Sequence, residues 1–161
     1  MTFRGQQKLI GCVLAALMAA SCAANKPTND ELPLTRALNT ANESAEKTVA
    51  QFIEAYNAKD LNAMMALAHP DISWLSVEGN DISVMTDGAE ATFVELAQYL
   101  GPDDNPRSDV EILKSHGNFV TTLERAYFVV DGEEKSQASF AMYEVVDGTN
   151  ILRVWYFPSS E

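Results

Sequence analysis

Cysteine is scarce in this chain, and both copies lie close to its N-terminus. Cys12 and Cys22 are the only two among 161 residues, so the chain after residue 22 has no thiol. That part therefore offers neither a disulfide nor a thiol nucleophile, nor a zinc or iron–sulfur site built on Cys. Its stability has to come from an ordinary hydrophobic core, for which it is long enough as one domain.

Positive charge is scarce as well. All 23 acidic residues follow Cys22, together with only nine of the 11 Lys and Arg, so this part has a formal charge of −14. A strongly negative surface repels polyanions. We therefore expect no nucleic-acid partner, and no attraction to anionic lipid through surface charge.

The chain also lacks an apolar run long enough to cross a bilayer. Its longest such run, Leu9 to Ala20, falls well short of the roughly 20 residues that a spanning helix needs. Arg4 and Lys8 stand before this run, and small residues follow it. This order is typical of a secretory signal peptide, which we predict over residues 1–21.

The residues at the end of that leader carry a further prediction. Ala19-Ala20-Ser21-Cys22 resembles the bacterial lipobox, in which the Cys is lipidated and becomes the new N-terminus. The prediction is lipidation at Cys22, and an exported protein held at the cell envelope by a lipid anchor with its domain in the periplasm. The lipobox usually has Leu where Ala19 stands, so cleavage after Ala24, giving a soluble periplasmic or secreted protein, is the alternative.

The remaining chain divides into a tether and a domain. Residues 22–40, with Pro27 and Pro33, are predicted to form a flexible tether, and residues 41–161 the domain. Thr40 and Glu43 have the spacing of a capping box at the start of a helix. The elements predicted from periodicity and turn dipeptides are helices near 40–57, 61–68 and 87–100 and strands near 71–77, 81–85, 108–115, 119–130, 135–146 and 150–157.

The pattern within the helices predicts which faces are buried. On the first helix the apolar positions fall on one face, and on the third helix Asp87 and Glu90 form a second capping signature. The expected inward residues are Ala45, Val49, Phe52, Ile53 and Tyr56 on the first helix and Phe93, Leu96, Ala97 and Leu100 on the third. The order of elements predicts an α+β fold, with helices covering one face of a curved antiparallel sheet.

Three stretches carry a resemblance to a known superfamily. FIEAYNAKDLNAMMALAHPDISW resembles the opening of SnoaL-like and ketosteroid-isomerase-like members of the nuclear transport factor 2-like superfamily. FAMYEVVDGTNILRVWYF and LERAYF are similar to strands of the limonene-epoxide-hydrolase-like branch. The resemblance covers residues 43–158. It implies a cone-shaped barrel, open at one end, with a pocket for one small apolar or amphipathic molecule, and it makes a homodimer a possible partner.

The catalytic sets of those branches are largely replaced here. At the positions of the isomerase Tyr, base and second acid the resemblance places Phe52, Ser76 and Met142. Of the five epoxide-hydrolase positions only the Arg remains, as Arg125; the other four are held by Tyr127, Trp155, Trp74 and Ser76. Arg cannot take up a proton from water, because it stays protonated in proteins. We therefore expect binding rather than either known chemistry.

The predicted site follows from this resemblance. Arg125 is expected to point into the pocket, where its partner is either Glu144 on the neighbouring strand or a ligand carboxylate. The predicted pocket residues are Phe52, Tyr56, Trp74, Phe93, Arg125, Tyr127, Met142 and Trp155, and the candidates for catalysis are Arg125, Glu144, Tyr127 and Asp71.

The sequence predicts no metal site and no cofactor. Its two histidines, His69 and His116, lie far apart and show no ligand spacing. Three functions remain open: a small-molecule-binding domain, a hydrolase or isomerase with a non-standard set around Arg125, and a structural module that acts through dimerisation or an envelope partner.

Overall fold

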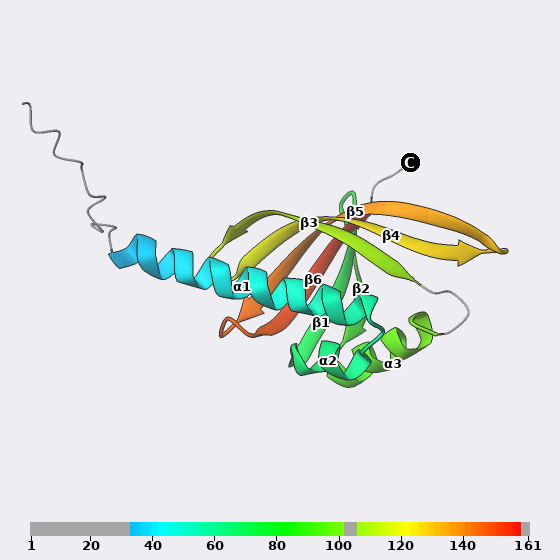
Figure 1. Cartoon of the computed structure of the whole chain (residues 1–161), viewed down its shortest axis with the longest axis horizontal. Helices are drawn as coiled ribbons and strands as arrows, with labels where there is room; N and C mark the ends of the chain where they lie inside the picture. The colour runs from blue at the N-terminus through cyan, green and yellow to red at the C-terminus, as the bar shows by residue number, and fades with distance from the viewer. Residues whose placement is uncertain (1–32, 102–105, 159–161) are drawn as a thin grey trace, which may run out of the picture. The chain divides into compact units, whose positions relative to one another are not determined.

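The computed structural model describes residues 33–101 and 106–158 (Figure 1). The predicted signal peptide, Cys22 and most of the predicted tether lie outside these residues. The elements are α1 (Pro33–Asn57), α2 (Leu61–Ala66), β1 (Ala68–Glu78), β2 (Asp81–Asp87), α3 (Ala89–Tyr99), β3 (Arg107–His116), β4 (Phe119–Val130), β5 (Glu133–Val146) and β6 (Asn150–Pro158). None of the helices in the described part is long and apolar enough to cross a membrane.

Helix α1 begins earlier than its sequence pattern predicts. It starts at Pro33, whose fixed φ suits the first helical position and whose missing N–H costs nothing there. Thr40 is therefore not a cap but lies inside the helix, where its hydroxyl donates to the carbonyl of Arg36 at 3.1 Å. The predicted inward face is confirmed, because Ala45, Val49 and Phe52 are almost fully buried.

The two short helices differ in how well their ends were predicted. Asp60 caps α2 as expected, with its carboxylate accepting from the N–H of Ala63 at 2.9 Å. The N-cap of α3 is Gly88 rather than Asp87, and no side chain caps it. Thr92 and Leu96 form the buried face of α3, whereas Phe93 is 41% exposed, contrary to the prediction.

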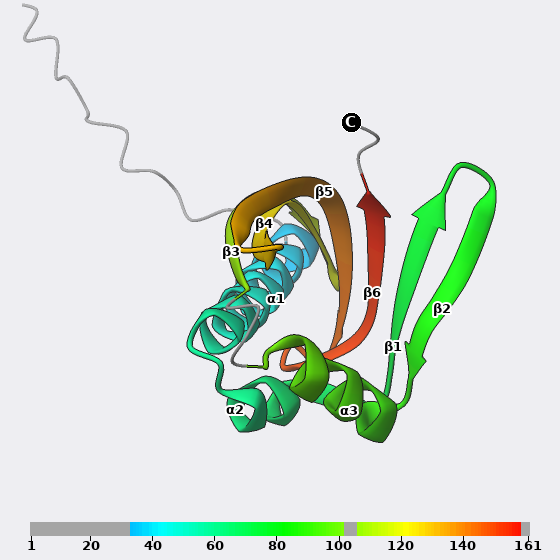
Figure 2. The same cartoon turned by 90° about the vertical axis from the view of Figure 1, so that its right-hand side faces the viewer.

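The six strands form one mixed sheet in the order β2-β1-β6-β5-β4-β3. The four later strands run antiparallel, as predicted, while β1 pairs with β6 in parallel. Figure 2 shows that the sheet curves around α1 without closing, so that α1 lies within its concave face and α2 and α3 lie across one end. The fold is thus α+β as predicted, with a sheet that is mixed rather than purely antiparallel.

Tight turns set the register of the long hairpins. Asp131-Gly132 joins β4 to β5 and Asp147-Gly148 joins β5 to β6, and all four residues have positive φ. Asp-Gly is favoured at the two central positions of such turns because both positions need this backbone conformation. The resulting β4–β5 register pairs Glu124 with Ser139, which decides the composition of the concave wall.

The core lies between α1 and the concave face of the sheet. Its fully buried residues come from α1, α2, α3, β1 and the strands β4 to β6, and include Val49, Met64, Ile72, Leu96, Val120, Tyr143 and Val154. This core occupies one end of the sheet, and towards the other end the concave face opens into a pocket.

Candidate functional site

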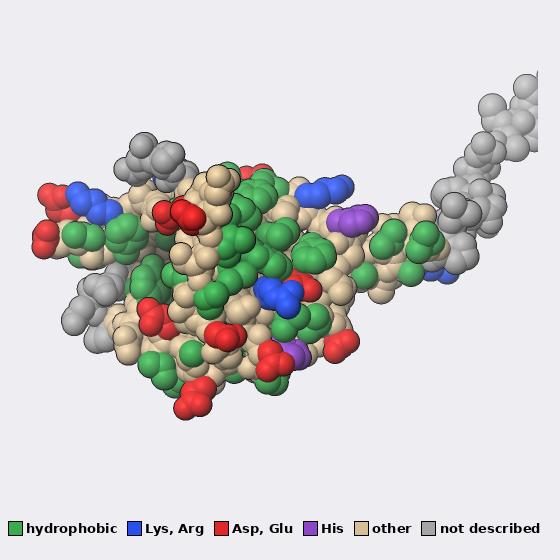
Figure 3. Space-filling view, turned by 180° about the vertical axis from the view of Figure 1, so that it is seen from behind, with side chains coloured by type: hydrophobic (Ala, Val, Ile, Leu, Met, Phe, Trp, Pro, Cys, Tyr) green, Lys and Arg blue, Asp and Glu red, His purple; other side chains and the backbone are tan. Residues whose placement is uncertain are grey.

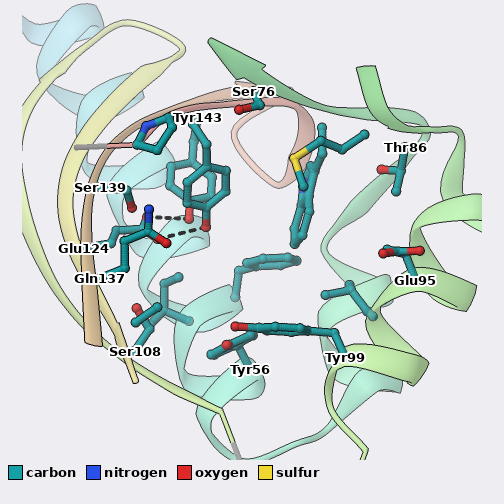
Figure 4. A pocket seen from close by; sticks show the side chains of 18 of the residues that line it. Tyr56, Ser76, Thr86, Glu95, Tyr99, Ser108, Glu124, Gln137, Ser139 and Tyr143 are labelled. Carbon is teal, nitrogen blue, oxygen red and sulfur yellow. Dashed lines mark hydrogen bonds between the residues drawn. The ribbon is translucent and has the colours of Figure 1, made fainter. Parts of the chain in front are cut away.

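A pocket of about 420 Å³ opens between the concave face of the sheet, α1 and α3. Figure 4 shows its walls from close by. The side chains that line it are Phe52, Ile53, Tyr56, Trp74, Ser76, Glu78, Met85, Thr86, Glu95, Leu96, Tyr99, Ser108, Glu124, Ala126, Gln137, Ser139, Tyr143, Tyr156 and Pro158. Apolar and aromatic groups dominate this set, and its polar groups lie mainly on the sheet.

The carboxylate of Glu124 is the most enclosed charged group of the pocket. The residue is only 3% exposed, and it lies on the concave side of β4. Oε1 accepts from the hydroxyl of Tyr143 at 2.6 Å and from that of Thr122 at 2.8 Å, and Oε2 accepts from the hydroxyl of Tyr156 at 2.9 Å. Three strands thereby fix one carboxylate, since Tyr143 belongs to β5 and Tyr156 to β6.

The two tyrosines that hold Glu124 are strongly perturbed acids. Burial and the adjacent charge of Glu124 raise the pKa of Tyr143 and of Tyr156 well above the ordinary value of 10.0. Both phenols are thus kept as neutral donors across the whole physiological range. The arrangement is one acceptor held by three hydroxyl donors.

Aromatic rings form the walls opposite and beside Glu124. Trp74 meets Phe52 edge to face with ring centroids 6.4 Å apart, and Tyr156 in the same manner at 6.1 Å. Tyr56 of α1 stacks on Tyr99 of α3 at 6.5 Å. These contacts place rings from two helices and two strands around one cavity, which favours an apolar occupant.

Two further carboxylates, Glu78 and Glu95, line the pocket from exposed positions. Glu78 ends β1 and Glu95 lies on α3, and in Figure 4 Glu95 lies on the side opposite Glu124. Both are open to water, so their charges are solvated. Among the described residues that line the pocket, none is Lys, Arg or His.

The comparisons with known proteins agree with this architecture. The sequence model of the SnoaL-like domain family matches residues 49–154, most of the folded part. The chain belongs to the SnoaL-like family. No curated protein matches it.

Several solved structures share the fold of this SnoaL-like domain. An LEH-like epoxide hydrolase from M. tuberculosis has a TM-score of 0.62 at 17% identity, over 73% of this chain and 84% of that chain. Bal32a, from a soil-derived mobile gene cassette, reaches 0.64 at 18% identity, over 74% and 92%. An NTF2-like protein of unknown function from Burkholderia pseudomallei reaches 0.59 at 16%, over 72% and 91%. At these identities the likeness shows the fold alone.

The structure brings only part of the predicted site together. Phe52, Tyr56 and Trp74 line the pocket of the SnoaL-like domain as expected. The other five predicted pocket residues, Phe93, Arg125, Tyr127, Met142 and Trp155, are not among its lining residues. On β4, β5 and β6 the lining residues include Glu124, Tyr143 and Tyr156. Each is the direct neighbour in the chain of a predicted residue, namely Arg125, Met142 and Trp155.

Arg125 lies on the convex face of the sheet and not in the pocket. Its guanidinium is exposed and donates to the hydroxyl of Ser136 at 3.3 Å. The reason is strand alternation: Glu124 faces the concave side, so its neighbour faces the other way. Tyr127 shares this convex face, where the Arg107 guanidinium lies 3.6 Å from the centroid of its ring.

The expected pairing of Arg125 with Glu144 is also absent. Glu144 accepts from Arg153 at 2.8 Å, across the β5–β6 pair. The side chain of Asp71 is mostly exposed near the start of β1, where its carboxylate lies beside the imidazole of His69. None of the four predicted catalytic candidates lines the pocket. Glu124, the enclosed carboxylate of the pocket, is not among the predicted site residues.

The signal that could have identified Glu124 is that it shares its strand face with small polar residues. Thr122 and Glu124 share one face of β4, and Ser139 on the next strand lies opposite Glu124. Small hydroxyl residues around a single carboxylate are the composition expected for a buried, hydrogen-bonded acid rather than for a solvated face.

Proposed function

We propose that this SnoaL-like domain binds a small, largely apolar molecule in its pocket and that Glu124 anchors the polar group of that molecule. The observation that carries the proposal is a buried carboxylate fixed in the wall of an otherwise mainly apolar cavity. Glu124 is 3% exposed and hydrogen-bonded by three strands, so it is oriented before any ligand arrives.

The size and the hydrogen-bonding capacity of the pocket support this reading. A volume of about 420 Å³ lies in the range of small-molecule sites. A carboxylate has about four acceptor positions, and Thr122, Tyr143 and Tyr156 occupy three of them. One position, on Oε2, remains for a donor on the ligand.

Native mass spectrometry of the folded domain tests this function. The protein is purified from cells, and the mass of the folded species is compared with that of the denatured chain. Ser139→Phe places a ring beside Glu124, and Leu123→Phe places the same ring on the convex face, where Leu123 is 45% exposed. We expect a bound molecule in the wild type and in Leu123→Phe but not in Ser139→Phe. Equal occupancy of both variants would contradict binding in this pocket.

A second candidate function is proton transfer by Glu124. The observation that favours it is the seclusion of this carboxylate from water, which is how general bases are tuned in enzymes. The three hydroxyl donors act against it, since they occupy most of the acceptor positions that a substrate proton would need. An enzyme would lose its turnover in Glu124→Gln while keeping substrate binding; a binding protein would show no turnover to lose.

We further propose that the chain is exported and lipid-anchored through Cys22. The support is the order of charged, apolar and small residues in the leader. Expressed in a bacterial host, the full chain is expected to lose residues 1–21 and gain acyl mass on Cys22. Cys22→Ser is expected to abolish the acylation; an unmodified chain beginning at Asn25 would instead establish cleavage after Ala24.

We also propose a second copy of this chain as a partner, through the convex face of the sheet. Figure 3 shows hydrophobic side chains gathered on the side opposite the view of Figure 1. On this face Phe119 packs against Trp155 and Phe140 against Phe157, while Leu123 lies 45% exposed. An apolar surface of this kind is typical of an interaction site.

A further inference from the structure

The pocket holds negative charge without a positive partner. Its lining includes Glu78, Glu95 and Glu124, and among the described lining residues there is no Lys, Arg or His. Glu78 and Glu95 are exposed, so water and salt compensate their charges. Glu124 is enclosed and depends on its immediate surroundings.

Glu124 is an acceptor in each of its hydrogen bonds, since the hydroxyls of Thr122, Tyr143 and Tyr156 all donate to it. The ion pairs formed within residues 33–101 and 106–158 involve other carboxylates. Three hydroxyls satisfy the hydrogen bonding of Glu124 but carry no charge, and a positive group in the pocket would add an electrostatic partner to it.

Lys59, a basic side chain that lies against the pocket residue Tyr56, does not fill this role. The ammonium of Lys59 lies 5.4 Å from the centroid of the Tyr56 ring, and Lys59 is not a lining residue. A metal ion does not fit either, because no group of three or more His, Cys, Asp or Glu in the described part could hold one. Neither Lys59 nor a metal ion therefore pairs with Glu124 in the described part of the chain.

The walls suit an organic cation. Six aromatic side chains line the pocket, from α1, α3, β1, β5 and β6: Phe52, Tyr56, Trp74, Tyr99, Tyr143 and Tyr156. The negative face of an aromatic ring attracts ammonium groups, including quaternary ones that cannot donate a hydrogen bond. The same rings supply apolar contact for the rest of a ligand.

A polar atom without a partner lies on the same wall. Ser108 is 7% exposed and lines the pocket, and its hydroxyl has no hydrogen-bond partner among the described residues. Ser108 pairs with Ala126 in the sheet, two positions from Glu124 on the same face of β4. A polar group on the ligand would therefore find a second contact close to the carboxylate.

We propose that the pocket selects an organic cation, a protonated amine or quaternary ammonium group carried on an apolar body. The cationic group lies near Glu124 and against the aromatic rings, and the apolar body lies along the walls formed by α1 and α3. This proposal rests on the proposed binding function and adds the charge of the ligand to it.

The test compares two probes of the same shape. One is a phenylalkyl trimethylammonium ion, and the other is its carbon isostere, in which a neutral tert-butyl group replaces the trimethylammonium. Binding of each to the full folded domain is measured by calorimetry or by ligand-observed NMR. We expect the cation to bind at least about tenfold more tightly than the isostere, a factor that corresponds to about 1.4 kcal/mol. Glu124→Gln is expected to remove most of that preference, and Glu144→Gln, on the convex face, to leave it unchanged.

The outcomes separate this inference from the function on which it rests. Equal or tighter binding of the neutral isostere would overturn the selection of a cation and leave the apolar pocket standing. Binding of neither probe counts against both proposals. If Glu124→Gln fails to fold, the comparison of the two probes on the wild-type protein still decides the matter, because it needs no variant.

Discussion

The hydroxyl of Tyr143 on β5 donates to Oε1 of Glu124 on β4 across 2.6 Å, inside the concave face of the sheet. This contact connects the fold to its candidate site. Glu124 can remain in the wall of an apolar pocket because Tyr143, Tyr156 and Thr122 satisfy it, and these donors stand at fixed register positions on the same face of the sheet.

Removal of the Tyr143 hydroxyl tests the energetic part of this relationship. Tyr143→Phe leaves a buried carboxylate with one donor fewer, so we expect a loss of about 1–3 kcal/mol in the free energy of unfolding. Tyr127→Phe, on the convex face, serves as the matched control and is expected to change it by less than about 0.5 kcal/mol. Urea denaturation measures both. Equal losses in the two variants would mean that the hydrogen bond from Tyr143 to Glu124 does not stabilise the fold.

Glu124 and Arg125 are adjacent in the chain but lie on opposite faces of the sheet, so their truncation should have unequal effects. Glu124→Ala leaves three hydroxyl donors without their acceptor and opens space in the wall. We expect it to lower the free energy of unfolding by more than about 2 kcal/mol. Arg125 is exposed and bonded only to Ser136 at 3.3 Å among the described contacts, so Arg125→Ala should stay within about 0.5 kcal/mol. If Arg125→Ala lost more free energy of unfolding than Glu124→Ala, the assignment of Glu124 as the structurally embedded charge would be wrong.

Alkaline pH should destabilise the domain through its buried tyrosines. The pKa values of Tyr143 and Tyr156 are raised in the folded state above the ordinary 10.0 of the unfolded chain. Their contribution is complete below pH 10, and above it the unfolded chain releases protons that the folded chain keeps. The free energy of unfolding therefore falls as the pH rises, by about 1.4 kcal/mol per pH unit for each tyrosine. Tyr143→Phe and Tyr156→Phe should each make this fall shallower, and an unchanged slope in both would refute the assignment.

The convex face offers a test of self-association. Leu123→Glu places a charge in the apolar surface that it shares with Phe140, and it should convert a dimer into a monomer, because a buried charge without a partner is costly. Val94→Glu is the control, since Val94 is similarly exposed, at 50%, but lies on α3. Light scattering after gel filtration gives the mass of each. A wild-type protein that is already monomeric at high concentration would argue against the dimer.

The fold could largely be predicted because its boundaries are marked by local chemistry. Asp131-Gly132 and Asp147-Gly148 fix the hairpins, and the β-strand limits follow from them within a few residues. The start of α1 was misplaced because Thr40 mimics a cap, while Pro33 is equally suited to the first turn.

The site was harder to predict because both faces of the sheet are apolar. Alternation separates the faces of a strand but does not say which one meets the core. On β4 the convex residues Phe119 and Leu123 are as hydrophobic as core residues, although they are 41% and 45% exposed. The sequence pattern therefore predicts Arg125 as the pocket residue, whereas the structure has Glu124 there. The choice is resolved by the packing of α1 within the concave face of the sheet, the face on which Glu124 is only 3% exposed.

The central claim is that Glu124 meets the ligand of the pocket, and its side-chain carboxyl resonance in ¹³C NMR tests this most directly. The signal is assigned by its disappearance in Glu124→Gln, and that of Glu144 on the convex face by Glu144→Gln. On titration with the tighter-binding of the two isosteric probes, we predict that the Glu124 resonance shifts in proportion to occupancy while that of Glu144 stays in place. A saturable probe that leaves the Glu124 resonance unmoved, or that shifts both equally, would contradict the account.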